Sequence, residues 1–129
     1  MPNTRIEIVE GWLGSRKAAF IEAMHQALVA ALRIPEHDRT LRLIEHPREN
    51  VSLPPGKSER YTLIEITLFA GRSLAAKRQL YRALVQNLEA FGVPAQDVKV
   101  ALIDVPRENW GIRGGQAACD VDLGFEVAV

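Results

Sequence analysis

The sequence contains an internal repeat, and this repeat limits the folds that the chain can adopt. The segment Pro-Arg-Glu-Asn occurs at residues 47–50 and again at 106–109, each time after Leu-Ile and an acidic residue. A Pro-x-x-Asp segment precedes each apolar run, at 35–38 and 94–97, and these matches share one offset of 59 residues. A fixed offset over several matches predicts two copies of one structural unit, at about residues 2–50 and 61–109.

Each unit reads as strand, helix and strand. Alternating polar and apolar residues predict strands, and apolar residues at helical spacing predict the helices between them. Ser15 and Ser73 are the expected helix caps. The expected strands cover residues 5–9, 40–45, 61–68 and 98–105, and the expected helices run from Ser15 to about 32 and from Ser73 to about 91. The expected apolar stripe of the first helix is Phe20, Met24, Ala27, Leu28 and Ala31, and the second helix is expected to place Lys77, Tyr81, Leu84, Leu88 and Phe91 on one stripe.

Two further segments lie outside these elements. Residues 46–60 contain three prolines and have no hydrophobic period, so they are expected to form a long connecting loop. Residues 110–129 form a tail after the second unit, in which 117–127 could make one or two short strands.

The repeat predicts the fold class. A strand–helix–strand unit makes its two strands parallel, so two units give a four-stranded sheet with both helices on one face. We therefore expect one α+β domain over residues 1–129. The strand at 98–105 is apolar on both of its faces, and the two helices can cover only one. Other subunits are expected to cover the second face, in a homo-oligomer.

Composition excludes several classes of function. Lys plus Arg and Asp plus Glu are 16 each, so the net charge is zero and a nucleic-acid or membrane-surface binder is disfavoured. The single Cys119 excludes an internal disulfide, and the three histidines lack the spacing of metal ligands. No phosphate-binding motif is present, and no apolar run approaches about 18 residues. The sequence predicts a cytoplasmic protein without metal or cofactor.

Pro2 follows the initiator methionine directly. Removal of Met1 would leave Pro2 with a free secondary amine. An α-amino group titrates near about 8, and an apolar or cationic pocket could bring this pKa toward neutrality. Pro2 would then serve as a general base. Proline can also reach position two by chance, and with Met1 retained its nitrogen is an amide that cannot act as a base.

These features together resemble the tautomerase superfamily, whose members carry an amino-terminal proline and duplicated strand–helix–strand units. The subgroup most similar in pattern is that of malonate semialdehyde decarboxylase and cis-3-chloroacrylic acid dehalogenase. The resemblance implies a trimer in which the sheets line a central barrel. It rests on Pro2, on Pro35-x-x-Asp38-Arg39, on Gly71-Arg72-Ser73 with Lys77, and on Asn109-Trp110-Gly111.

The resemblance also implies roles for individual residues. Pro2 would be the catalytic amine, Asp38 would assist it, and Arg72 would bind the substrate carboxylate. Trp110 would wall the pocket. The decarboxylase-like pattern has two arginines after the third strand, whereas this chain has only Arg72 there. From the chemistry of an enolate, Arg39 is a further candidate for substrate binding, and Arg113 is another.

Each assignment has a structural alternative. Asp38 could cap a turn, as its repeat partner Asp97 is expected to do. The arginines could be solvated or paired with surface acids, and Trp110 could be a packing residue.

The sequence therefore predicts a cofactor-independent tautomerase of small enol or 2-oxo carboxylic acids. Two alternatives stay open. One is a decarboxylase, or a hydratase or dehalogenase, of a small three-carbon acid on the same scaffold. The other is a non-catalytic oligomeric protein whose proline is blocked.

Overall fold

Two strand–helix–strand units follow one another in the computed structural model, which describes residues 1–129. The first unit consists of β1 (Asn3–Val9), α1 (Lys17–Leu32) and β2 (Thr40–His46). The second consists of β3 (Thr62–Phe69), α2 (Leu74–Glu89) and β4 (Val98–Val105). The expected order of elements is confirmed, and the strand at 98–105 has the expected bounds.

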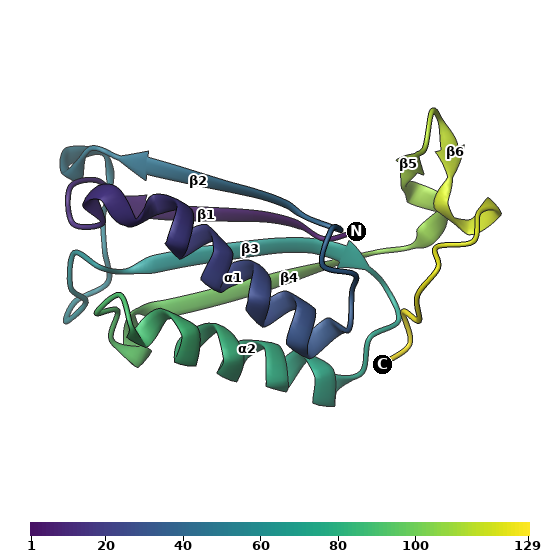
Figure 1. The fold of residues 1–129 in the computed structure, drawn as a ribbon. Helices are drawn as coiled ribbons and strands as arrows, with labels where there is room; N and C mark the ends of the chain where they lie inside the picture. The colour runs from purple at the N-terminus through teal and green to yellow at the C-terminus, as the bar shows by residue number, and fades with distance from the viewer.

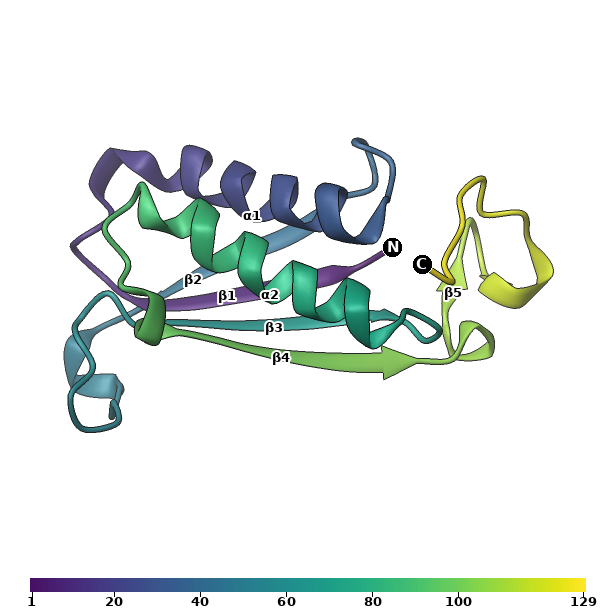
Figure 2. The same cartoon turned by 90° about the horizontal axis from the view of Figure 1, so that it is seen from below.

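The four strands form one mixed sheet in the order β2-β1-β3-β4. Within each unit the two strands are parallel, and the units meet where β1 pairs antiparallel with β3. Both helices pack on the same face of this sheet, so the molecule has two layers (Figures 1 and 2). The predicted α+β class is confirmed. No helix is both long and apolar enough to cross a membrane.

The core lies between the sheet and the two helices. Alternate residues of each central strand point into it, since side chains of a strand alternate between its faces. The α1 stripe is buried as predicted. The largest fully buried side chains that the central strands and α1 contribute to this core are Ile6, Ile64, Ile66, Leu68, Phe20, Met24, Leu28 and Leu32.

The opposite face of the sheet carries no helix (Figure 2). On β4 this face presents Ala101, Ile103 and Val105, and the Ile103 side chain is 47% exposed. On β3 it presents Leu63, Glu65 and Thr67, which are half-buried. A single chain therefore leaves apolar side chains on the uncovered face.

Two details of the helices differ from the predictions. Ser73 caps α2, where its hydroxyl accepts a hydrogen bond from the Ala76 N–H at 3.1 Å, but Ser15 caps nothing. Ser15 lies in a 3₁₀ turn, Gly14–Arg16, which precedes α1. The stripe predicted for α2 was partly wrong, because Lys77 and Tyr81 are half-buried. The buried α2 residues are Ala76, Leu80, Leu84 and Leu88.

The tail folds against the end of the sheet that holds the amino terminus (Figure 1). Its strands are β5 (Gly111–Ile112) and β6 (Gln116–Ala117), which form a small hairpin. The prediction of strands within 117–127 was wrong beyond Ala117, since a 3₁₀ turn and irregular chain follow. Val127 then packs with Phe69 and Ala118 in a second, small hydrophobic cluster.

Candidate active site at the amino terminus

The strand register brings three segments of the chain to one place. Asn3 at the start of β1 pairs with Thr40 at the start of β2 and with Thr67 near the end of β3. The chain before β1, the turn before β2 and the turn after β3 therefore meet at one end of the sheet. These segments carry Pro2, Asp38 and Arg72, so the structure brings together the three residues predicted to be catalytic.

Asp38 faces the amino terminus. Its Oδ2 lies 3.3 Å from the amine of Met1, and its side chain is only 12% exposed. That oxygen makes no other polar contact in the protein. Burial lowers the pKa of the Met1 amine below its ordinary value, while the Asp38 carboxylate raises it and the Arg72 charge lowers it. The net direction is downward, which favours the neutral, basic form of an amine at this position.

Arg72 is a buried cation with free donors. Its residue is 6% exposed, and one guanidinium nitrogen, Nη1, donates to the Phe69 carbonyl at 3.2 Å. The other two, Nε and Nη2, are buried and have no partner. Burial lowers the pKa of Arg72, and the carboxylates of Asp38 and Asp104 oppose this shift. A buried guanidinium with unpaired donors is suited to an anionic ligand, especially a carboxylate.

The two copies of the Pro-x-x-Asp turn have diverged in their contacts. Both close in the same way, with the Asp38 N–H bonded to the Pro35 carbonyl at 3.0 Å and the Asp97 N–H to Pro94 at 2.9 Å. Oδ2 of the Asp97 carboxylate accepts two hydrogen bonds from Ser58, one from its backbone N–H at 3.1 Å and one from its hydroxyl. Asp97 therefore holds its own turn, whereas the Asp38 carboxylate is free to face the amine.

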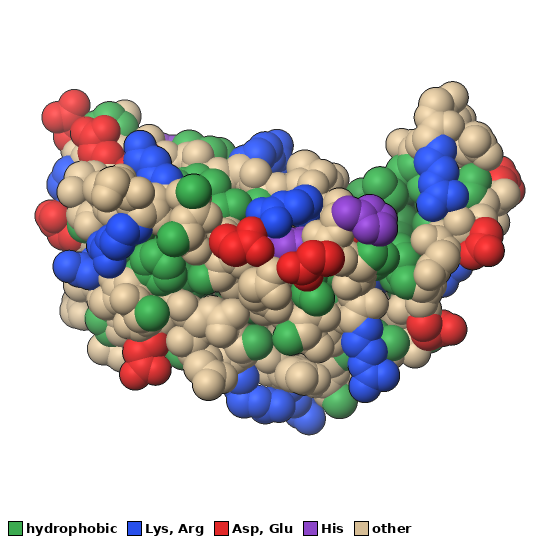
Figure 3. All heavy atoms as spheres, viewed as in Figure 1, with side chains coloured by type: hydrophobic (Ala, Val, Ile, Leu, Met, Phe, Trp, Pro, Cys, Tyr) green, Lys and Arg blue, Asp and Glu red, His purple; other side chains and the backbone are tan.

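A cavity of about 290 Å³ opens beside the amino terminus. Figure 3 shows a hollow between the body of the molecule and the projecting hairpin, with hydrophobic side chains on its wall. Met1 lines this cavity, whereas Pro2 is buried and does not. The tail contributes an apolar wall that the sequence reasoning missed. The lining residues are Met1, Pro35, His37, Asp38, Arg39, Thr40, Arg113, Leu123 and Phe125.

The three predicted substrate-binding residues have different surroundings. Arg39 lines the cavity, but its guanidinium pairs with Glu22 of α1 at 2.8 Å. Arg113 also lines it, at the turn of the hairpin, and donates to the Asp122 carbonyl at 2.8 Å. Trp110 does not line it. Its indole donates to the Val105 carbonyl at 3.1 Å and packs edge-on against Phe69, so Trp110 supports the tail.

The chain matches a family model described as "Tautomerase enzyme" over residues 38–113. Two curated relatives are tautomerases. The Probable tautomerase YrdN of Bacillus subtilis (strain 168) is 25% identical over 123 residues, which cover 91% of this chain and 95% of that protein. A 2-hydroxymuconate tautomerase of Comamonas testosteroni is 41% identical over 54 residues, which cover 41% of this chain and 86% of that protein.

Two solved structures have the same fold over nearly their whole length. One is an FG41 malonate semialdehyde decarboxylase inhibited by 3-bromopropiolate, with a TM-score of 0.81 and 27% identity. That match covers 89% of this chain and 92% of the other. The second is a fused 4-OT symmetric trimer, also with a TM-score of 0.81 and 27% identity, covering 90% of this chain and 95% of the other.

Proposed function

The chain belongs to the tautomerase enzyme family, and on that premise we propose that it interconverts the enol and keto forms of small 2-oxo carboxylic acids without a cofactor. One observation carries this proposal. The amine of Met1 lies 3.3 Å from the Asp38 carboxylate, whose Oδ2 has no other partner, and the pKa of this amine is lowered by burial and by the charge of Arg72, a buried arginine with unused donors. A base, a group that orients it and a carboxylate binder are the parts that this chemistry requires.

The base in this proposal is the secondary amine of Pro2 after removal of Met1. Removal moves the free amine by one residue, about 3.5 Å along the chain. It also takes away the Met1 side chain, which lines the cavity and packs against the small cluster of Phe69, Ala118 and Val127. We propose that the Pro2 amine then faces the space that the Met1 side chain leaves, and that the substrate binds there. The neutral amine accepts the proton of the enol hydroxyl, and the resulting ammonium returns a proton to carbon.

Arg72 is proposed to bind the substrate carboxylate through its two unpartnered donors, Nε and Nη2. Asp38 is proposed to orient the amine and to stabilise its protonated form during the transfer. Arg113 is proposed to contact the substrate from the hairpin, because it lines the cavity beside the amino terminus, as Asp38 does. Arg39 is proposed to bind substrate only when it releases Glu22, to which it is paired in this structure. Trp110 is proposed to act indirectly, by packing against Phe69 under the tail.

A second candidate is decarboxylation, or hydration, of a small acid on the same scaffold. The likeness to malonate semialdehyde decarboxylase favours it. These reactions need a protonated amine at neutral pH, which would act as an acid. Here burial lowers the pKa of the terminal amine, which favours its neutral form. The chain also has one buried arginine, Arg72, where the decarboxylase-like pattern has two. Tautomerisation is therefore the preferred proposal.

We also propose that the chain forms a homotrimer through the uncovered face of its sheet. The apolar side chains of β4 on that face and the likeness to a fused 4-OT symmetric trimer support this. Light scattering is expected to give three times the 14.3 kDa chain mass, whereas a stable monomer would contradict the proposal.

The activity is tested with a purified protein whose intact mass shows that Met1 is absent. We expect this protein to ketonise phenylenolpyruvate with kcat/KM above about 10⁴ M⁻¹s⁻¹, within the usual range for enzymes. Malonate semialdehyde, assayed in parallel for loss of carbon dioxide, reports on the second candidate. Decarboxylation without ketonisation would replace the proposed reaction, and neither activity in the processed protein would contradict both.

A further inference from the structure

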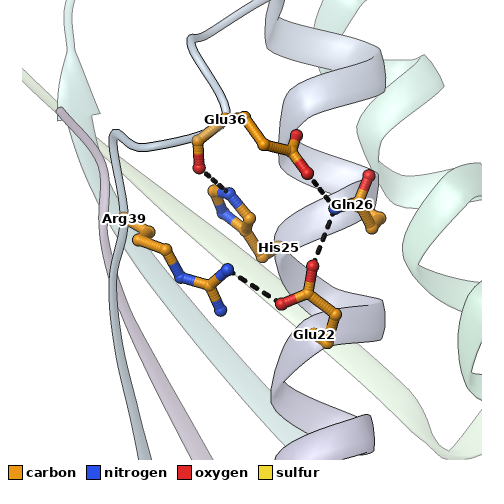
Figure 4. Close-up of polar contacts among 5 residues, drawn as sticks. All are labelled: Glu22, His25, Gln26, Glu36 and Arg39. Carbon is orange, nitrogen blue, oxygen red and sulfur yellow. Dashed lines mark hydrogen bonds and ion pairs between the residues drawn. The ribbon is translucent and has the colours of Figure 1, made fainter.

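The turn that carries Asp38 is fastened to α1 by a group of polar side chains (Figure 4). His25 Nε2 donates to the Glu36 carbonyl at 2.7 Å, and Gln26 donates to the Glu36 carboxylate at 2.6 Å. Arg39, which follows Asp38 directly, pairs with Glu22 at 2.8 Å. The turn is therefore held on both sides of Asp38.

Among these contacts, that of His25 is the least exposed, because it is part-buried. The His25 residue is 0% exposed, whereas the Gln26–Glu36 and Arg39–Glu22 contacts are exposed. A carbonyl only accepts hydrogen bonds, so Nε2 of His25 must carry the proton. Its Nδ1 is buried without a partner. Water competes more with the two exposed contacts than with this part-buried one, so we expect the His25 bond to contribute most to fixing the turn.

The repeat shows why the first turn needs such a bond. In the second unit the Asp97 carboxylate itself fastens the turn, through Ser58. In the first unit Oδ2 of the equivalent carboxylate faces the amine at 3.3 Å and accepts no hydrogen bond that would hold the turn. The first turn is held by other groups instead, among them the backbone carbonyl of Glu36, which lies two residues before Asp38.

We propose that His25 is a positioning residue, which holds the Glu36 carbonyl and so keeps the Asp38 carboxylate against the terminal amine. Its catalytic consequence rests on the proposed tautomerase function, but its structural consequence does not. A loosened turn would let the carboxylate move away from the amine, and the reaction would lose an oriented base.

Three substitutions separate this role from packing. His25→Gln places an amide N–H near the position of Nε2 and can keep the bond to Glu36, whereas His25→Asn is too short and His25→Leu has no donor. We expect His25→Gln to retain kcat within about twofold, and the other two to lose roughly tenfold to 100-fold with KM little changed. An equal loss in all three would contradict the proposal, because packing and not the bond would then explain it.

Titration of the terminal amine by NMR gives a second readout that needs no turnover. The charged groups facing the amine are Asp38, which raises its pKa, and Arg72, which lowers it. His25→Leu is therefore expected to lower the pKa of the amine, since it weakens the effect of Asp38, and His25→Gln is expected to leave it unchanged. In an Asp38→Asn background, His25→Leu should add no further shift.

The two readouts keep the proposals distinct. Suppose that the wild-type protein has no activity, but that His25→Leu still shifts the pKa of the terminal amine, and only when Asp38 is present. This result would contradict the proposed function and support the positioning role. An active wild type in which His25→Leu changes neither kcat nor the amine pKa would overturn the positioning role. Thermal unfolding of each variant shows whether it is folded, and His25→Asn replaces His25→Leu if the latter is not.

Discussion

Pro2→Ala is expected to lower kcat/KM for enol ketonisation by about 10²-fold or more, the scale of a general base. Methionine is removed before alanine as it is before proline, so the variant still carries an amine near Asp38. That amine is primary, however, and the ring that fixes the direction of the nitrogen lone pair is lost. Initial rates with phenylenolpyruvate over a range of concentrations measure the effect.

Intact mass must show that Met1 is absent from both proteins, because a retained methionine would leave a different amine at the site. The structure includes Met1, and the amine of Met1 lies 3.3 Å from the Asp38 carboxylate. Light scattering shows whether the assembly is unchanged. A processed Pro2→Ala protein with the turnover of the wild type would remove proline from the mechanism.

Arg72→Ala is expected to lower kcat/KM for carboxylate substrates by about 10²- to 10⁴-fold. Two unpartnered donors of a buried guanidinium are lost, and each charge-assisted hydrogen bond contributes roughly 1.5–3 kcal/mol. The acidic limb of the pH profile should also move to higher pH. Arg72 lowers the pKa of the terminal amine, so its removal leaves the amine protonated to a higher pH.

Two comparisons show whether Arg72 acts on the carboxylate. Arg72→Lys keeps the charge but loses the planar fork, and should recover only part of the activity. An ester of the same enol has no carboxylate anion, so the wild type and Arg72→Ala should convert it with similar kcat/KM. An equal loss on the acid and the ester would indicate instead that the substitution disturbs the fold.

The fold could be predicted from the sequence because the repeat and the hydrophobic periods agree. Two copies of one unit fix the parallel pairs, and the only remaining choice is how the units join. Details that depend on one local contact could not be predicted in this way. Ser15 and Ser73 look alike as caps, but the chain before α1 turns through Gly14–Arg16, so only Ser73 meets an N–H of its helix.

The meeting of Pro2, Asp38 and Arg72 was implied by the family resemblance, and the strand register accounts for it, because the three residues lie next to strand ends at one end of the sheet. The cavity wall made by Leu123 and Phe125 could not, since the tail has no regular structure there. The alternation of apolar residues at 121–127 was a signal, but it suggested a strand. His25 was also missed, because a helical histidine shows its partner only once the turn at Glu36 is in place.

The central claim is that the Pro2 amine is a base with a depressed pKa, and NMR titration of ¹⁵N-labelled Pro2 in the processed protein tests it most directly. Burial is expected to lower this pKa below the usual value of about 8, as it lowers that of the amine in the structure. The neutral amine is the active form, so kcat/KM should rise with pH through the same midpoint and then level off. A Pro2 amine that titrates at or above 8, or at a midpoint that the activity does not follow, would contradict the account.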